Sequence, residues 1–219
     1  AARHATYLAK NPEQKTRWPD LHEEFVDHAG FTVEGATAGS RSVIHFALTP
    51  AQAVDSWMGT FYHRLPLLNP GLFGVGVAAD EGVVVLDVAS LVAPVRHSHV
   101  VVWPVPDARD VPRGFEPELP NPVPDEDLSQ MGFPITVQLF FEVQENHETL
   151  DMTLVEGGSG SPREVDAVLL SPDEPRFAEL APENAWCLIP RKKLAAETVY
   201  TVSAKWTSGE KTWSFTTGN

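Results

Sequence analysis

Residues 49–64 read Thr-Pro-Ala-Gln-Ala-Val-Asp-Ser-Trp-Met-Gly-Thr-Phe-Tyr-His-Arg, and this stretch carries the clearest structural signals in the chain. Its first four residues predict the start of a helix, because Thr49 can cap it, Pro50 suits the first helical position and Gln52 can close a capping box. The apolar side chains that follow have helical spacing and are expected on one face: Val54, Trp57, Met58 and Phe61. Pro66 is then expected to end the helix.

The flanking residues predict that this helix belongs to a small domain of mixed helix and strand. Residues 1–10 have a helical pattern that stops at Asn11-Pro12. Residues 73–78 and 83–88 predict two paired strands around the turn Asp80-Glu81-Gly82, and residues 99–103 predict a further strand. We therefore assign residues 1–103 to a first domain that contains both helices and strands.

Residues 104–131 differ in composition from the rest of the chain. They hold seven of the 19 prolines and carry a net charge of −5. Because proline fixes φ and removes a hydrogen-bond donor, this segment is predicted to be an extended, semi-rigid linker. Trp103, Phe115 and Met131 could anchor it to a neighbouring domain.

Residues 132–219 predict an all-β domain. Apolar and polar residues alternate over 135–143 and 150–154, and further strands are expected at 165–170, 200–206 and 212–217. Gly209 indicates a tight hairpin between the last two strands, and residues 157–162 (Gly-Gly-Ser-Gly-Ser-Pro) indicate a hairpin or loop. Short strands at this spacing favour an immunoglobulin-like β-sandwich. The fold class of the whole chain is therefore predicted as α+β.

The composition excludes several classes of function. Acidic residues outnumber basic residues 30 to 16, which gives a net charge of −14 without a basic run, so nucleic acid is not an expected partner. No apolar run approaches the roughly 18 residues that span a membrane. Cys187 is the single cysteine and lies in the apolar run 185–189, where it is expected to pack as a small hydrophobic residue.

The histidines are the residues most suggestive of chemistry. His22-Glu23-Glu24 together with His28 forms a polar cluster of the kind that binds metal. However, the zinc-protease pattern places two histidines four residues apart on one helix, whereas these two are six apart. His97 and His99 would share one face of a strand and are a second possibility, although two ordinary surface histidines explain them as well.

Residues 49–64, followed by Leu67-Leu68-Asn69-Pro70-Gly71-Leu72-Phe73-Gly74-Val75-Gly76-Val77, resemble the bacterial branch of the CAP superfamily of SCP-like (cysteine-rich secretory) proteins. The resemblance extends over residues 1–92 and implies an α-β-α sandwich whose first long helix would precede residue 1. The last two strands, with Tyr200 in one and Phe215-Thr216-Thr217 in the other, resemble those of a bacterial Ig-like domain.

The resemblance to CAP proteins also implies a cleft with two histidines and two acidic residues, which sometimes holds a divalent metal. His63 and Arg64 match the family's His-Arg pair, and His22 matches the other cleft histidine. The two acidic positions read Ser40 and Thr60 instead, and Glu24 or Glu34 could substitute. The cleft candidates are therefore His22, Glu24, His63 and Arg64, and His22 and His63 are the candidate ligands of a zinc ion.

Two functions follow from this resemblance. The first is a non-catalytic, secreted or cell-surface module that binds a protein, glycan or lipid partner, with the Ig-like domain as spacer or docking element. The alternative is a metal-dependent hydrolase in which His22 and His63 bind the metal and Glu24 is the general base. The expected location is extracytoplasmic in both cases, because CAP and Ig-like domains are typically exported.

Overall fold

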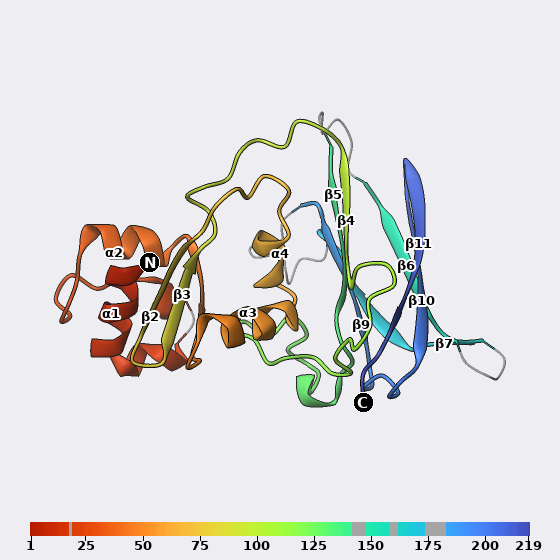
Figure 1. Cartoon of the computed structure of the whole chain (residues 1–219), viewed down its shortest axis with the longest axis horizontal. Coiled ribbons are helices and arrows are strands. Elements are labelled where there is room, and N and C mark those ends of the chain that lie inside the picture. The colour runs from red at the N-terminus through yellow and green to blue at the C-terminus, as the bar shows by residue number, and fades with distance from the viewer. Residues whose placement is uncertain (18, 142–147, 158–161, 174–182) are drawn as a thin grey trace. The chain divides into compact units, whose positions relative to one another are not determined.

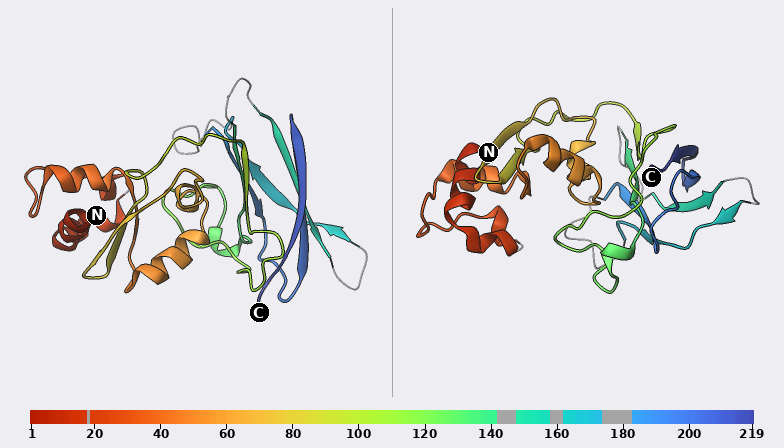
Figure 2. Two further views of the ribbon diagram at one scale, coloured as in Figure 1. Left: turned by 45° about the horizontal axis from the view of Figure 1, so that its top comes forward. Right: turned by 60° about the horizontal axis from the view of Figure 1, so that its bottom comes forward.

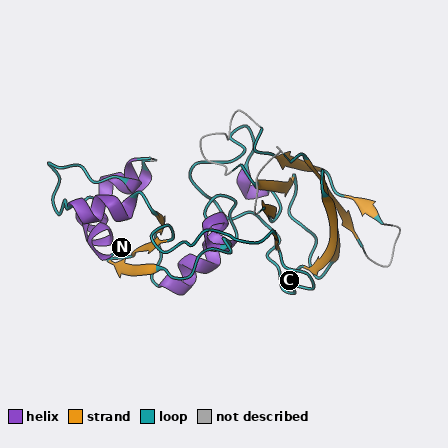
Figure 3. Cartoon of the chain, turned by 90° about the horizontal axis from the view of Figure 1, so that it is seen from above, coloured by secondary structure: helices purple, strands orange, loops and turns teal. Residues whose placement is uncertain are grey.

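The structure is a computed structural model that describes residues 1–17, 19–141, 148–157, 162–173 and 183–219. Its contacts divide the chain into two compact units, each made of two pieces of sequence. The N-terminal unit consists of Ala1–Met58 and Pro66–Pro94, and the C-terminal unit of Gly59–Leu65 and Val95–Asn219. Helices are concentrated in the first unit and strands in the second, as the colours of Figure 3 show. The described chain is rich in β-structure.

The N-terminal unit is built on an antiparallel sheet with the strand order β1-β3-β2. Its elements are α1 (Ala2–Lys10), α2 (Val33–Gly39), β1 (Ser42–His45), α3 (Pro50–Met58), β2 (Gly76–Asp80) and β3 (Val83–Asp87), with 3-10 turns at Pro12–Thr16 and Asp20–His22. Alternate residues of β3 face opposite sides, so Val83 and Val85 pack with α1 whereas Val84 and Leu86 pack with α3. Figure 1 shows these two helices on opposite sides of the β2–β3 hairpin.

Local sequence signals predicted two features of this unit correctly. Gln52 N donates to Thr49 Oγ1 at 3.3 Å and Thr49 N donates to Gln52 Oε1 at 3.1 Å, which is the reciprocal pattern of a capping box. The turn between β2 and β3 has positive φ at Glu81 (43°) and at Gly82 (77°), as a two-residue hairpin turn requires.

The predicted apolar face of α3 is divided between the two units. The helix stops before Gly59, where the chain passes into the C-terminal unit. Trp57 is buried in the core of the N-terminal unit, whereas Phe61 lies beyond the helix and is buried in the C-terminal unit. Val54 is 37% exposed. The spacing therefore identified buried aromatic residues but extended the helix too far.

The C-terminal unit is a two-sheet sandwich (Figures 1 and 2). One sheet has the order β11-β10-β6-β7 and the other the order β4-β5-β9-β8. The strands are β4 (His99–Trp103), β5 (Ile135–Phe140), β6 (Leu150–Glu156), β7 (Arg163–Glu164), β8 (Ala167–Leu170), β9 (Ala185–Pro190), β10 (Val199–Trp206) and β11 (Gly209–Thr216). The hairpin at Gly209 is confirmed, since Gly209 pairs with Trp206. Residues 158–161 of the predicted loop lie outside the described residues.

The strand β9 is buried on both faces, because the sheet that contains it separates two apolar clusters. Trp186 and Leu188 face the core between the two sheets. Cys187 and Ile189 face the opposite side, which we call the outer face. Cys187 is a fully buried free thiol, as the apolar run predicted, and burial raises its pKa.

The outer face is covered by two stretches of chain that have little regular structure. The first is Gly59–Leu65, which we call the crossover segment and which contributes Phe61 and Leu65; a short helix, α4 (Arg64–Leu67), begins within it. The second lies within residues 104–131 and contributes Phe115, Val123 and Met131, with a 3-10 turn at Leu128–Gln130. Proline-rich chain therefore forms part of the packed C-terminal unit.

The boundaries between the two units differ from the predicted domain boundaries at residues 103 and 131. The strand β4 was assigned to the first domain, but it pairs with β5, and Val102 is buried in the core between the sheets. Residues 104–131 were assigned to a separate linker, yet Phe115 N donates to Met131 O at 3.2 Å within the C-terminal unit. Phe115 and Met131 are nevertheless the buried anchors that the sequence indicated.

Replacing Trp57 with alanine is expected to lower the free energy of unfolding by about 3–5 kcal/mol. The Trp57 side chain is 1% exposed, and its indole Nε1 donates to Ile44 O at 3.4 Å. Urea unfolding of the full chain, followed by circular dichroism, measures the loss. Val54→Ala on the same helix is the control and should cost about 1 kcal/mol or less. Equal losses in the two variants would contradict the packing described for α3.

Candidate functional site

Glu118 carries a fully buried carboxylate that accepts three hydrogen bonds from the crossover segment. The donors are Phe61 N at 2.7 Å, Tyr62 N at 3.0 Å and His63 Nδ1 at 2.9 Å. Because a buried charge is stable only when it is hydrogen-bonded, these donors explain how Glu118 lies under the surface. The His63 side chain is 16% exposed. Its Nδ1 atom bonds to Glu118, so Nε2 is the ring nitrogen that this bond does not use.

Arg64 follows His63 and is completely buried. Its Nη1 donates to Pro134 O at 2.7 Å, and the guanidinium carbon lies 4.9 Å from the centre of the Phe133 ring. Nε and Nη2 have no hydrogen-bond partner among the described residues. Burial lowers the pKa of Arg64 to about 10, because the charged form loses its water. Arg64 is therefore a buried cation with incomplete compensation.

In the N-terminal unit, the buried carboxylate of Glu24 bonds to His4. His4 Nδ1 lies 3.1 Å from Glu24 Oε1 and His4 Nε2 lies 3.0 Å from Leu21 O, so the imidazole connects the Glu24 carboxyl group to a backbone carbonyl. Thr32 N donates to the other oxygen of Glu24 at 2.8 Å. A Cβ atom at residue 35 would lie 2.1 Å from Glu24 Oε1, so Gly35 permits this close approach of α2.

The four predicted cleft residues are distributed over both units. His22 lies in the N-terminal unit, where its Nδ1 is 3.1 Å from Gly39 O, and Glu24 contacts His4. His63 and Arg64 lie in the C-terminal unit. The structure thus brings His63 together with Glu118, and neither unit contains both His22 and His63.

The predicted zinc site requires about four ligands, or three ligands and a water. Within the part of the chain that the structure describes, no group of three or more His, Cys, Asp or Glu side chains is placed to hold a metal ion. These residues therefore give no support to zinc at His22 and His63.

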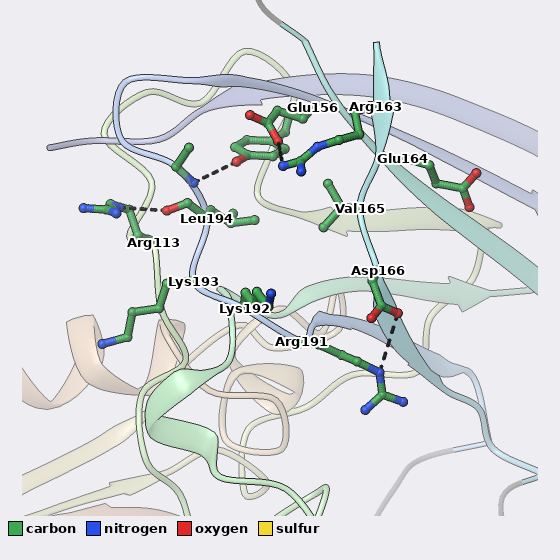
Figure 4. Close-up of a pocket in the computed structure, with 12 residues that line it drawn as sticks. Arg113, Glu156, Arg163, Glu164, Val165, Asp166, Arg191, Lys192, Lys193 and Leu194 are labelled. Atoms are coloured by element: carbon green, nitrogen blue, oxygen red, sulfur yellow. Dashed lines mark hydrogen bonds and ion pairs between the residues drawn. The ribbon is translucent and has the colours of Figure 1, made fainter.

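A hollow of about 340 Å³ opens in the C-terminal unit beside the loop of residues 191–195 (Figure 4). Five of the 16 basic residues line it, although the chain has a net charge of −14. These are Arg113, Arg163, Arg191, Lys192 and Lys193, and three acidic residues also line it, Glu156, Glu164 and Asp166. We call this site the basic hollow.

Ion pairs neutralise two of the five cations. Arg163 Nη2 lies 2.5 Å from Glu156 Oε2. Arg191 contacts both Glu126 and Asp166, and its Nε lies 3.6 Å from Asp166 Oδ1. Figure 4 shows the Glu156–Arg163 and Asp166–Arg191 pairs at separate places around the hollow.

The other three cations keep free donors. The side chains of Lys192 and Lys193 form no hydrogen bond or ion pair among the residues that the structure describes, although Lys193 lies close enough to Asp127 to help lower the pKa of that carboxyl. Arg113 donates from Nε to Leu194 O at 2.8 Å, and its two terminal nitrogens have no such partner within the same described ranges. Because these groups are cations in an otherwise acidic chain, the hollow can attract and bind an anionic group.

Backbone contacts hold the loop that carries these lysines. Leu194 N donates to Arg113 O at 2.9 Å, Arg191 N donates to Asp166 O at 3.0 Å, and Ala195 N donates to the hydroxyl of Tyr200 at 2.8 Å. Tyr200 is buried, and this burial raises its pKa. The loop is thus positioned before any ligand binds.

Sequence reasoning missed the residues that matter most in these sites. Glu118 and His4 bond to partners distant in sequence, and no local pattern distinguishes Glu118 from the other acidic residues of 104–131. The basic hollow did have a signal, the consecutive residues Arg191, Lys192 and Lys193. The prediction that the chain has no basic run was therefore wrong at this triplet.

No protein-family model matches the chain, and no curated protein matches it. Among solved structures, the chain is similar to PcoC, a methionine-rich copper resistance protein from Escherichia coli, with 18% identity and a TM-score of 0.34 over 55% of this chain and 98% of PcoC. This TM-score is too low for PcoC to inform fold or function here. Within the described ranges, no helix has the length and apolar character needed to cross a membrane.

Glu118→Ala is expected to lower the free energy of unfolding by about 3 kcal/mol, because it leaves the buried N–H group of Phe61 and the partly buried N–H group of Tyr62 without an acceptor. His63→Ala should cost about 1 kcal/mol or less, as for most positions outside a packed core. Urea unfolding of both variants gives the comparison. The reverse ranking would mean that His63, and not Glu118, holds the crossover segment.

Arg64→Met is expected to leave the free energy of unfolding unchanged or to raise it by up to about 2 kcal/mol, because a buried charge with unpaired donors is replaced by an apolar side chain of similar length. Arg64→Ala is the matched control and should cost about 2–4 kcal/mol, since it leaves a cavity. Similar losses in both variants would show that the guanidinium itself stabilises the fold.

Proposed function

We propose that the chain is a non-catalytic binding module, and that its C-terminal unit binds an anionic group of a partner in the basic hollow. The observation that carries this proposal is the set of free cations at the hollow, Lys192, Lys193 and Arg113, in a chain with a net charge of −14. Acidic surroundings disfavour an anion elsewhere on the chain, so a local group of unpaired cations marks a specific place for it.

The use of the histidines and carboxylates supports binding over hydrolysis. A hydrolase of the alternative kind needs His22 and His63 at one metal ion and Glu24 within reach of a substrate. Instead, the Glu24 carboxylate is fully buried against His4, and the His63 ring bonds to the buried Glu118. These groups contribute to the packing of their own units.

The family assignment and the location belong to the same proposal. The helices on both faces of the antiparallel sheet in the N-terminal unit, and the two-sheet sandwich of the C-terminal unit, support an assignment to CAP-like and Ig-like domains. On this assignment the chain acts outside the cytoplasm. Its partner is a protein, glycan or lipid that carries an acidic group.

Titration of the ¹⁵N-labelled full chain with inorganic phosphate tests the proposed binding. We expect saturable shifts of the amide signals of residues 191–195, which weaken as ionic strength rises. The double variant Lys192→Gln/Lys193→Gln should bind phosphate about tenfold more weakly, because two charge-assisted contacts are lost.

The control is Lys205→Gln/Lys211→Gln, which removes the same charge from β10 and β11, outside the lining of the hollow. This variant should bind phosphate as the unchanged chain does. An equal loss in both double variants would mean that only net charge matters and would overturn the assignment to the hollow.

Metal content separates the proposal from the hydrolase alternative. The chain is purified without chelator and its zinc is measured, together with that of His22→Gln and His63→Gln. Stoichiometric zinc that is lost from both variants would favour the hydrolase and overturn the non-catalytic function.

A further inference from the structure

The crossover segment belongs by sequence to the first part of the chain, residues 1–94, but by contacts to the C-terminal unit. The rest of that unit is formed by the second part of the chain, residues 95–219. A single peptide bond, between Pro94 and Val95, joins the two parts. The crossover segment is therefore held on the second part by non-covalent docking.

Hydrogen bonds fix the crossover segment along its whole length, and their partners all lie in residues 95–219. They run from Glu116 N to Gly59 O at 3.2 Å, from Phe61 N and Tyr62 N to the Glu118 carboxylate, from Arg64 Nη1 to Pro134 O, and from Gln138 Nε2 to Leu65 O at 3.4 Å. The docked segment thus has main-chain contacts at both of its ends and in its middle.

The apolar side chains of the crossover segment are equally well accommodated. Phe61 is 1% exposed and Leu65 is 3% exposed. Both pack on the outer face in the cluster that contains Cys187 and Ile189 of β9. A buried apolar centre of this kind, surrounded by hydrogen bonds, is what the core of a protein–protein interface contains.

The connector between the two parts, residues 94–98, is short and makes few contacts. Ala93 N donates to Gly71 O at 2.8 Å, which holds residue 93 in the N-terminal unit, and His99 begins β4. Residues 94–98 form no hydrogen bond within the described ranges, and four of the five are exposed. The connector can therefore change conformation without the loss of a described hydrogen bond.

We propose that the outer face of the C-terminal unit also receives the crossover segment of a second copy of the chain. Two copies then exchange their residues 1–94 and form a domain-swapped dimer. Each contact of the crossover segment is made between copies instead of within one, with the Glu118 carboxylate as acceptor in both cases. The exchange needs no further surface, since only the connector has to rearrange.

The connector decides which of the two forms prevails. A short flexible connector gives an effective concentration of about 1 mM for docking within one copy, so at about 10 µM chain the exchanged dimer is disfavoured about a hundredfold. A connector that is too short strains docking within one copy, which favours exchange. The length of the connector is therefore the variable to change.

A full-chain variant that lacks residues 96–98 tests the proposal. The deletion halves the reach between residues 93 and 99, because each residue spans at most about 3.6 Å. We expect this variant to sediment as a dimer at about 10 µM, where the unshortened chain is a monomer. The unshortened chain should form the dimer after it is unfolded in urea and refolded at about 1 mM.

The thiol of Cys187 shows whether the outer face is covered. Cys187 is the single cysteine, is fully buried and lies in the cluster with Phe61 and Leu65, so a thiol reagent reports on this face alone. In the dimer of the shortened variant, dithiobis(nitrobenzoate) should react with it at least about a hundredfold more slowly than in the urea-unfolded chain.

The matched control lengthens the connector by Gly-Ser-Gly-Ser after Val95, which relieves any strain on docking within one copy. This variant should be a monomer with a protected thiol. A shortened variant that stays monomeric would overturn the exchange, whether its thiol is protected or reactive. A dimer with a reactive thiol would overturn it as well, because the copies would then associate through another surface and leave the outer face uncovered.

Discussion

The outer face of the C-terminal unit depends on the hydrogen bonds that the buried carboxylate of Glu118 accepts. Glu118 accepts hydrogen bonds from three consecutive residues of the crossover segment, Phe61, Tyr62 and His63. Only the last residues of that segment are helical, so this carboxylate provides much of its backbone pairing. The fixed segment then places Phe61 and Leu65 over Cys187 and its neighbours in β9.

The same segment introduces a buried cation, and the two charges differ in how well they are satisfied. Glu118 has donors on both carboxylate oxygens, whereas two guanidinium nitrogens of Arg64 have no partner among the described residues. Desolvation is therefore balanced by hydrogen bonds at Glu118 and only partly at Arg64. The loss of water around the Arg64 guanidinium is compensated in part by its packing against Phe133 and by its hydrogen bond to Pro134 O.

Features that depend on neighbouring residues could be predicted from the sequence, whereas contacts between residues far apart in the sequence could not. The Thr49 cap, the turn at Glu81 and the hairpin at Gly209 are decided by neighbouring residues and were predicted correctly. The strand β9 was recognised only as an apolar run, because burial on both faces removes the alternation that marks a strand. Glu118 could not be identified, since its donors lie 55 to 57 residues away and depend on the complete fold.

The crossover segment also has a consequence for the order of events during synthesis. It leaves the ribosome long before the chain that it will cover, because its hydrogen-bond partners Pro134 and Gln138 follow Arg64 and Leu65 by 70 and 73 residues and β9 comes later still. Until then Phe61 and Leu65 remain exposed on an incomplete nascent chain, where apolar surface is vulnerable to aggregation. The sandwich therefore matures late, and a fragment that begins after residue 94 would complete its strands while leaving the outer face of its sheet without this cover.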